Sequence, residues 1–299
     1  MLNIKERQSL NEVYVCGVLK DLNIEEKTTA DGRKFVSGVA TIRVEQETNG
    51  SLYTSEVPVR MFSMEKKSDG VTPNANYTRI VNYANQFTSL SAVEDPAMAS
   101  KVICQGQTCN LKENAYFDKA KNTLYQKGFQ VEGNFLNAKR DSDDEAARFE
   151  VVGVIGKTRD EMKGDEPTGR LLVDFIIIGY QGKVGVVTLV AEEAARAHIE
   201  QNWENGDTVK VAGDIVMSFK TIEEVDDSGF GKPIVRKRTV GTRELVITGG
   251  SRSGFDPDLS YDATDIKEAL AERQANLEKM QTAQPAKAAA AKPKSGFDF

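Results

Sequence analysis

Hydrophobic and polar positions alternate along most of the chain, and this alternation occurs in two successive runs of similar order. The first run opens with Val13-Tyr-Val-Cys-Gly17-Val-Leu-Lys20, and the second with Phe149-Glu-Val-Val-Gly153-Val-Ile-Gly-Lys157. Each opening is an apolar or alternating segment with a glycine inside it, which is typical of a half-buried strand that bends. The pattern therefore predicts two strand-rich units in tandem.

The first unit is predicted to contain five strands and one helix. Asp31-Gly32 and Asn49-Gly50 are turn signals that separate its first three strands. Apolar residues at helical spacing then predict a short amphipathic helix over residues 76–90. The expected strands cover residues 12–22, 34–47, 51–62, 101–108 and 126–138, with a longer excursion over residues 110–125.

The second unit repeats this order more compactly. Its helix is expected over residues 191–203, before Asn205-Gly206, which suits a helix C-cap. The order strand, strand, strand, helix, strand, strand is that of the OB-fold, a five-stranded Greek-key barrel. We therefore expect an all-β dominated protein with two OB-fold domains, residues 1–140 and 146–250. The strands expected in the second domain cover residues 148–157, 170–178, 183–190, 207–216 and 233–248.

The remainder of the chain has a different character. Residues 251–281 are expected to form a loop and a charged helix, whose role the pattern leaves open. Residues 282–299 are rich in Lys, Ala and Pro before a Phe-ended tip, which predicts a flexible linker and tail.

Length and composition fit a protein with two globular domains. The 299 residues suffice for two hydrophobic cores. The sequence contains no run of roughly 18 apolar residues, so no membrane span is predicted. The first residues lack the apolar segment of a secretory signal, so we expect a cytoplasmic location. Cys104 and Cys109 resemble half of a zinc site, but the chain has one histidine, His198, and structural zinc needs four ligands. We expect no metal and no cofactor.

Catalytic motifs are absent from the sequence. It contains neither a phosphate-binding Gly-x-x-x-x-Gly-Lys-Ser/Thr motif nor a Gly-x-Gly-x-x-Gly between strand and helix. His198 lies on a predicted helix beside Glu200 with no evident nucleophile. The acidic residues over 141–145 lie between the two domains, where a linker is a better interpretation than a metal site. We expect a binding protein and not an enzyme.

The candidate chemistry is a combination of cations and aromatic rings. An OB-fold binds its ligand across strands two and three, between the loops that join strands one and two and strands four and five. Single-stranded nucleic acid suits such a groove because cations follow the phosphates while rings stack on bases. The net charge of −6 argues weakly against nucleic acid, but the acidic residues cluster away from the predicted strands.

The candidate residues fall in both units. Phe35, Phe129 and Phe175 are more expected in the barrel cores, and Arg236 to Arg238 could also form a solvated hairpin. The nucleic-acid-binding candidates are Arg33, Lys34, Arg43, Tyr53, Arg60, Tyr116, Phe117 and Tyr125 in the first unit, and Arg170, Tyr180, Lys183, Lys220, Phe230, Arg236, Lys237 and Arg238 in the second.

Short motifs in both units resemble the single-stranded-DNA-binding proteins. In the first unit these are Val13-x-x-Cys-Gly17-x-Leu19 and Asp31-Gly-Arg-x-Phe35, and in the second Gly206-Asp-Thr-Val-x-Val-x-Gly213. With its two barrels, the chain looks most like a phage-encoded or otherwise divergent member. The resemblance implies a protein that binds and protects single-stranded DNA with little sequence specificity during replication, recombination and repair, in the host cytoplasm if it is phage-encoded.

The resemblance also implies a role for the end of the chain. Proteins of this family often carry an acidic, Phe-ended tail that docks on replication and repair proteins, and here Phe297, Asp298 and Phe299 correspond to it. The tail departs from the family pattern because it lacks a run of aspartates. Two other functions stay open, a structural protein whose barrels bind another protein and a single-stranded RNA-binding protein. A homo-oligomer is also left open.

Overall fold

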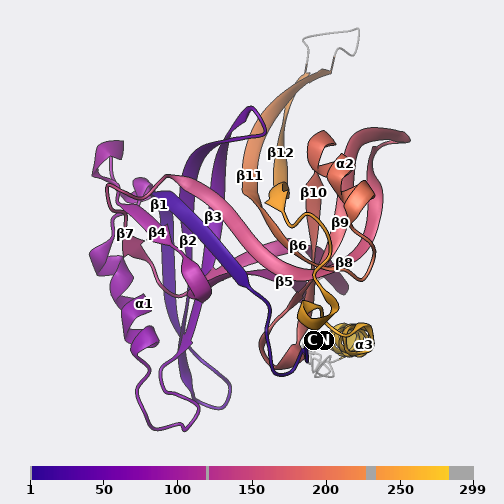
Figure 1. Ribbon diagram of the computed structural model, residues 1–299. Coiled ribbons are helices and arrows are strands. Elements are labelled where there is room, and N and C mark those ends of the chain that lie inside the picture. The colour runs from indigo at the N-terminus through magenta and orange to yellow at the C-terminus, as the bar shows by residue number, and fades with distance from the viewer. Residues whose placement is uncertain (1, 119–120, 227–233, 283–299) are drawn as a thin grey trace, which may run out of the picture.

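The computed structural model describes residues 2–118, 121–226 and 234–282, and these form two β-barrels side by side (Figure 1). The first contains β1 (Asn11–Thr28), β2 (Lys34–Thr48), β3 (Ser51–Met64), α1 (Ala75–Gln86), β4 (Lys101–Cys104), β5 (Cys109–Asp118), β6 (Thr123–Gly133) and β7 (Asn137–Ala138). The second contains β8 (Ala146–Lys163), β9 (Glu166–Ile178), β10 (Val184–Ala191), α2 (Glu193–Asn202), β11 (Thr208–Asp226) and β12 (Ile234–Gly250). The helix α3 (Ala263–Thr282) follows.

The second barrel has the strand pairing of an OB-fold. Its strands pair in the closed order β8, β9, β10, β12, β11 and back to β8, and β10 runs parallel to β12. The helix α2 lies between the third and fourth strands of this barrel. The predicted fold class of two OB-fold barrels followed by a helix is confirmed. The predicted elements of the second barrel are all present, but β8 and β11 extend several residues beyond the predicted ranges 148–157 and 207–216.

The first barrel has the same order, but its fourth strand is in two pieces. β4 pairs with β1, and β5 pairs with β6 after a short 3₁₀ helix, Gly106–Thr108. The excursion expected over residues 110–125 is therefore wrong, because residues 109–118 form a strand. Cys109 and Leu111 are buried in β5, but Lys112, Glu113 and Asn114 follow them and no later position of the strand is buried, so this strand has too little apolar alternation to be recognised.

The glycine in the first strand of each barrel allows close contact with the neighbouring strand. A Cβ atom on Gly17 would lie 2.2 Å from the carbonyl oxygen of Arg43, and one on Gly153 would lie 2.3 Å from that of Ile176. Both contacts involve backbone, which cannot move without shifting the strand. The two glycines therefore serve the same purpose in both barrels, and this explains why each strand-rich run opens around one.

Replacing Gly17 with alanine is expected to destabilise the protein by about 1–3 kcal/mol, because the added methyl group forces two paired strands apart. Urea denaturation would measure this loss. Gly249→Ala is a matched control, since a Cβ atom there meets nothing within 4 Å. Equal stabilities of the two variants would contradict the steric explanation.

The two barrels are joined through their first strands. β1 and β8 pair antiparallel from Asn11 with Val151 to Cys16 with Ala146. The buried Gln46 side chain extends this junction: its Oε1 accepts from the Ala147 N–H at 2.6 Å and its Nε2 donates to the Ala147 carbonyl at 3.2 Å. A single cluster of buried residues runs through both barrels. The barrels therefore share one sheet and one core.

A half-buried carboxyl group lies in the same junction. Asp214 on β11 accepts a hydrogen bond from Thr48 Oγ1 at 2.9 Å. Burial raises the pKa of Asp214, against the smaller opposing effects of the Thr48 hydroxyl and the positive charge of Arg148. The folded protein therefore holds this proton to a higher pH than the unfolded chain does, and the associated stability is lost as the pH rises through the raised pKa.

Asp214→Asn is accordingly expected to be more stable than the wild type near pH 7 and to lose that advantage as the pH falls toward about 4, the ordinary range of a carboxyl pKa. The amide keeps an acceptor for Thr48 and carries no charge. Urea denaturation of both proteins between these pH values measures the difference. If the difference in the free energy of unfolding between Asp214→Asn and the wild type does not change with pH, the pKa of Asp214 is not raised by folding.

The helix α3 and the N-terminal residues cover one face of the second barrel (Figure 1, lower right). They form a second hydrophobic cluster with the outer side of β8, β9 and β10, which contains Ile4, Val154, Ile176, Ile178, Tyr261, Ile266 and Ala269. Phe175 to Ile178 are all buried, because one face of β9 packs in the barrel and the other under this cover. Among the described residues, no helix has both the length and the apolar character needed to cross a membrane.

Candidate nucleic-acid interface

A groove of about 820 Å³ crosses the outer face of the first barrel. Side chains alternate along β2, so that Val36 and Ala40 are buried in the barrel while Ser37 and Val39 line the groove. We call this surface the first-barrel groove. Besides Ser37 and Val39 it is lined by residues that include Asn23, Arg60, Phe62, Gln107, Asn110, Lys112, Gln130, Glu132 and Asn134.

Two aromatic rings meet at this groove. The rings of Phe35 and Phe62 are 5.5 Å apart between centroids and tilted by 38°. Phe62 is 54% exposed, and its backbone N–H is held by Asn134 Oδ1 at 3.0 Å. The expectation that Phe35 lies in the barrel core is wrong, because its neighbour Val36 takes the inward position. An exposed ring fixed on a strand is a surface on which a base can stack.

The cations of the groove differ in how far they are neutralised. Lys112 pairs with Glu132, and Lys27 pairs with Glu25 at 2.5 Å. No carboxylate in the described part of the chain pairs with Arg60, which is exposed. Burial, and then the positive charge of Arg60, lower the pKa of the nearby Arg243. Positive charge is therefore available at Arg60.

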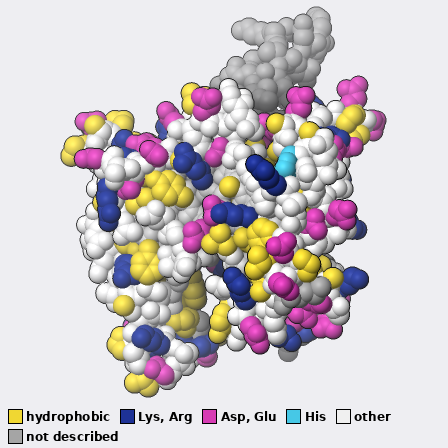
Figure 2. Space-filling model, in the orientation of Figure 1, with side chains coloured by type: hydrophobic (Ala, Val, Ile, Leu, Met, Phe, Trp, Pro, Cys, Tyr) yellow, Lys and Arg dark blue, Asp and Glu magenta, His cyan; other side chains and the backbone are white. Residues whose placement is uncertain are grey.

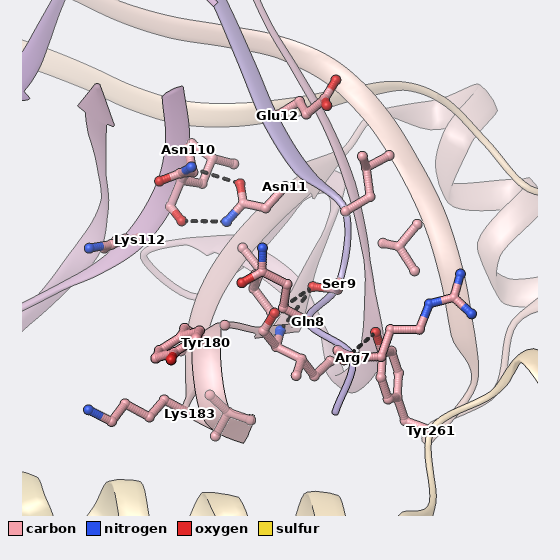
Figure 3. A pocket seen from close by; sticks show the side chains of 18 of the residues that line it. Arg7, Gln8, Ser9, Asn11, Glu12, Asn110, Lys112, Tyr180, Lys183 and Tyr261 are labelled. Carbon is pink, nitrogen blue, oxygen red and sulfur yellow. Dashed lines mark hydrogen bonds between the residues drawn. The ribbon is translucent and has the colours of Figure 1, made fainter. Parts of the chain in front are cut away.

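A second cavity, of about 900 Å³, lies between the two barrels (Figure 3). We call it the inter-barrel pocket. It is lined by residues 7–12, by β5, by the end of β9 and start of β10, and by Tyr261. Asn11 and Ser9 are engaged there in backbone contacts, Asn11 with the N–H and carbonyl of Leu111 and Ser9 with those of Ile178.

Three other side chains line one side of the inter-barrel pocket, namely Lys112, Tyr180 and Lys183 (Figure 3). Tyr180 is 73% exposed and lies in the turn between β9 and β10, where Gln181 adopts a left-handed conformation with φ 58°. Within the described residues, the side chains of Tyr180 and Lys183 have no hydrogen-bond or ion-pair partner. Lysine and arginine side chains also lie among hydrophobic ones over the middle of the face in Figure 2.

The structure thus brings three of the predicted residues to the two cavities: Arg60 to the first-barrel groove, and Tyr180 and Lys183 to the inter-barrel pocket. The others lie elsewhere. Arg33 pairs with Asp31 at 2.7 Å in the turn between β1 and β2, and Lys34 lies 4.0 Å from Glu65.

Two further candidates lie on β2 and β3. Arg43 is on the outer side of β2 and pairs with Glu45 at 3.4 Å. Tyr53 is half-buried on β3, at the parity of the inward-facing Ser55 and Val57, so it lies off the groove.

Three aromatic candidates lie on the hairpin of β5 and β6. The rings of Tyr116 and Tyr125 stack at 5.3 Å with an angle of 25° between their planes. Lys121 Nζ lies 5.9 Å from the centre of the Tyr125 ring. Tyr116 is 47% exposed and Phe117 is half-buried. This hairpin is the connection between strands four and five, one of the two loops that border an OB-fold groove.

Arg170 forms ion pairs with two carboxylates of the same chain. Its guanidinium binds Glu161 at 2.6 Å and Glu244 at 2.8 Å, and its side chain is 25% exposed. The Arg170 hydrogen bond is the largest effect that lowers the pKa of Glu161. With its charge balanced by two carboxylates, Arg170 has less to offer a phosphate than Arg60 does.

The remaining candidates lie on or near the hairpin of β11 and β12. Along the backbone, Arg236, Lys237 and Arg238 are opposite Glu224, Glu223 and Ile222. Lys220 is opposite Val240. The side chains of Lys220 and of Arg236 to Arg238 lie outside the described part of the structure, as does Phe230. Their assignment stays a prediction.

Phe62 and Lys112 are among the groove residues that were not predicted from the sequence. Phe62 is two positions after Arg60 in a strand already predicted, so the alternation of that strand was the signal that could have revealed it. Lys112 lies on β5, which was not predicted as a strand. Cys16, Cys104 and Cys109 are buried and unpaired, and the described residues contain no group of three or more His, Cys, Asp or Glu residues arranged to hold a metal ion.

The fold and the site define a protein of two fused OB-fold barrels with an open groove on the first. The chain belongs to the YorF family, whose model matches residues 9–283. It is also similar to the wild-type single-stranded DNA binding protein from Thermus aquaticus, with 12% identity and a TM-score of 0.49 over 86% of this chain and 99% of that one. A deletion mutant of that protein gives 13% identity and a TM-score of 0.47 over 84% and 98%. No curated protein matches the chain.

Proposed function

We propose that this protein binds single-stranded DNA with little sequence preference through the first-barrel groove. One observation carries the proposal: the exposed ring of Phe62, backed by Phe35, lies beside Arg60 on the outer face of β2 and β3, and no carboxylate among the described residues pairs with Arg60. This is the face on which OB-folds bind oligonucleotides. Stacking depends little on the identity of a base, because every base has a π-face.

The rest of the groove suits a strand whose bases are unpaired. Asn23, Gln130 and Asn134 line it with amide groups that can donate and accept hydrogen bonds. We assign the protein a binding role and not a catalytic one, in DNA replication, recombination or repair. The recruitment of partner proteins we assign to Phe297, Asp298 and Phe299, which lie outside the described residues.

The distribution of charge predicts how binding responds to salt. Both lysines that line the groove, Lys27 and Lys112, are paired with glutamates, so few phosphates can be neutralised. For single strands the slope of log K against log salt is about −0.7 per phosphate contact, so two or three contacts predict a slope of about −1.4 to −2.1.

Titration of oligo-dT with fluorescence detection across a salt series tests the proposal. Binding at low salt with a shallow slope supports it, and an absence of binding at low salt overturns it. Competition between ribo- and deoxyribo-oligonucleotides in the same assay separates DNA binding from RNA binding, since the 2′-hydroxyl distinguishes the two ligands.

A further inference from the structure

The two barrels do not offer equivalent surfaces to a ligand. The face of β9 and β10 that corresponds to the first-barrel groove is covered by α3 and the N-terminal residues. Ile176, Ile178, Val184 and Val186 pack there against Ile4, Ile266 and Leu270. The ion pair between Arg273 of α3 and Glu113 of β5 fixes the helix in place, since both side chains are more than four-fifths buried. A strand bound to the first barrel therefore cannot continue onto the matching face of the second.

The first-barrel groove nevertheless has a continuation. Gln107, Asn110 and Lys112 line both the groove and the inter-barrel pocket, so the two cavities meet at β5 and at the turn before it. Tyr180 and Lys183 lie beyond that meeting point, on the same side of the inter-barrel pocket as Lys112 (Figure 3). The pocket of about 900 Å³ is large enough for a ligand of nucleotide size.

The pocket carries the chemistry that such a ligand needs. Tyr180 offers an exposed ring and Lys183 an exposed ammonium group. Among the described residues, none forms a hydrogen bond with the Tyr180 hydroxyl or an ion pair with Lys183. A base can stack on the ring while a phosphate meets the cation. By contrast, Asn11 and Ser9 are engaged with backbone groups and serve to hold the pocket in shape.

On the basis of the proposed function, we infer that a bound single strand leaves the first-barrel groove across Lys112 and enters the inter-barrel pocket, where Tyr180 and Lys183 bind it. The second barrel then contributes through the turn between β9 and β10 and not through its own sheet face. The ligand is a single-stranded polynucleotide long enough to occupy both cavities.

Length-dependent binding tests this path. One oligo-dT of about 4 nucleotides and one of about 20 nucleotides span the range of site sizes of OB-folds. The variant carries Tyr180→Ala and Lys183→Ala, two exposed positions whose replacement leaves the core intact. We expect it to bind the long oligonucleotide about 10-fold more weakly than the wild type does, which is the loss of about one stacked base. Its affinity for the short one should be unchanged.

The matched control carries Phe219→Ala and Lys157→Ala, which remove an exposed ring and an exposed cation that line neither cavity. It should bind both lengths as the wild type does. If the wild type binds both lengths but the Tyr180/Lys183 variant shows no loss, or the same loss for both lengths, the path is wrong while the proposed function stands. If the wild type binds neither oligonucleotide, the proposed function itself fails.

Discussion

Phe62→Ala is expected to weaken the binding of oligo-dT by about 5- to 140-fold. Stacking of one base on an aromatic ring contributes about 1–3 kcal/mol, and each 1.4 kcal/mol is a factor of ten in affinity. Phe62 is 54% exposed and its ring packs against Phe35 on the barrel surface, so its removal takes away a stacking surface and little of the core. The two barrels should therefore fold normally in the variant.

Fluorescence titration at low salt measures this loss. Phe219→Ala is the matched control, because Phe219 is 65% exposed on the second barrel and does not line the first-barrel groove. The midpoint of urea denaturation should be nearly the same for both variants and the wild type. An equal loss of affinity in the two variants, or no loss in Phe62→Ala, would show that the groove is not the binding surface.

The fold was largely predictable from the sequence because both barrels follow simple alternation. In β2, buried Val36, Ala40 and Ile42 alternate with outer residues over the whole strand, and the turns at its two ends carry Asp-Gly and Asn-Gly. The signal fails on β5, where Leu111 is buried while Lys112 and Glu113 follow it. A strand that lies between a groove, a pocket and a helix carries polar side chains on its exposed positions, so its hydrophobic alternation is too weak to predict it.

The site was less predictable, because residue type does not reveal pairing. Arg60 and Arg170 look alike in the sequence, yet no carboxylate of the described residues pairs with Arg60, whereas Arg170 is held between Glu161 of β8 and Glu244 of β12. The position of α3 could not be predicted either. Its apolar residues indicate that one side is buried, but the surface they meet comes from β8, β9 and β10, which lie far earlier in the chain.

The partly buried pair of Glu113 and Arg273 is the contact whose loss should destabilise the protein most. Glu113 accepts a hydrogen bond from Arg273 Nε at 2.7 Å, is also bonded by Arg273 Nη2, and accepts one from the Val186 N–H at 3.3 Å. One side chain thus connects β5 of the first barrel, β10 of the second barrel and α3. Glu113→Ala leaves the largely buried guanidinium of Arg273 without a counter-charge, which costs up to about 3–5 kcal/mol.

Urea denaturation measures the global loss, and hydrogen exchange of the α3 amides reports whether the helix detaches first. We expect faster exchange in α3 than in α2 of the variant, because α3 is held by a small separate cluster and this ion pair, whereas α2 contributes Ile199 to the main core. Glu113→Leu combined with Arg273→Leu provides the matched comparison. Replacing both partners by apolar residues removes the uncompensated charge, so the double variant should be clearly more stable than Glu113→Ala. If the two variants are equally unstable, the cost arises from lost packing at this junction and not from an unpaired buried charge.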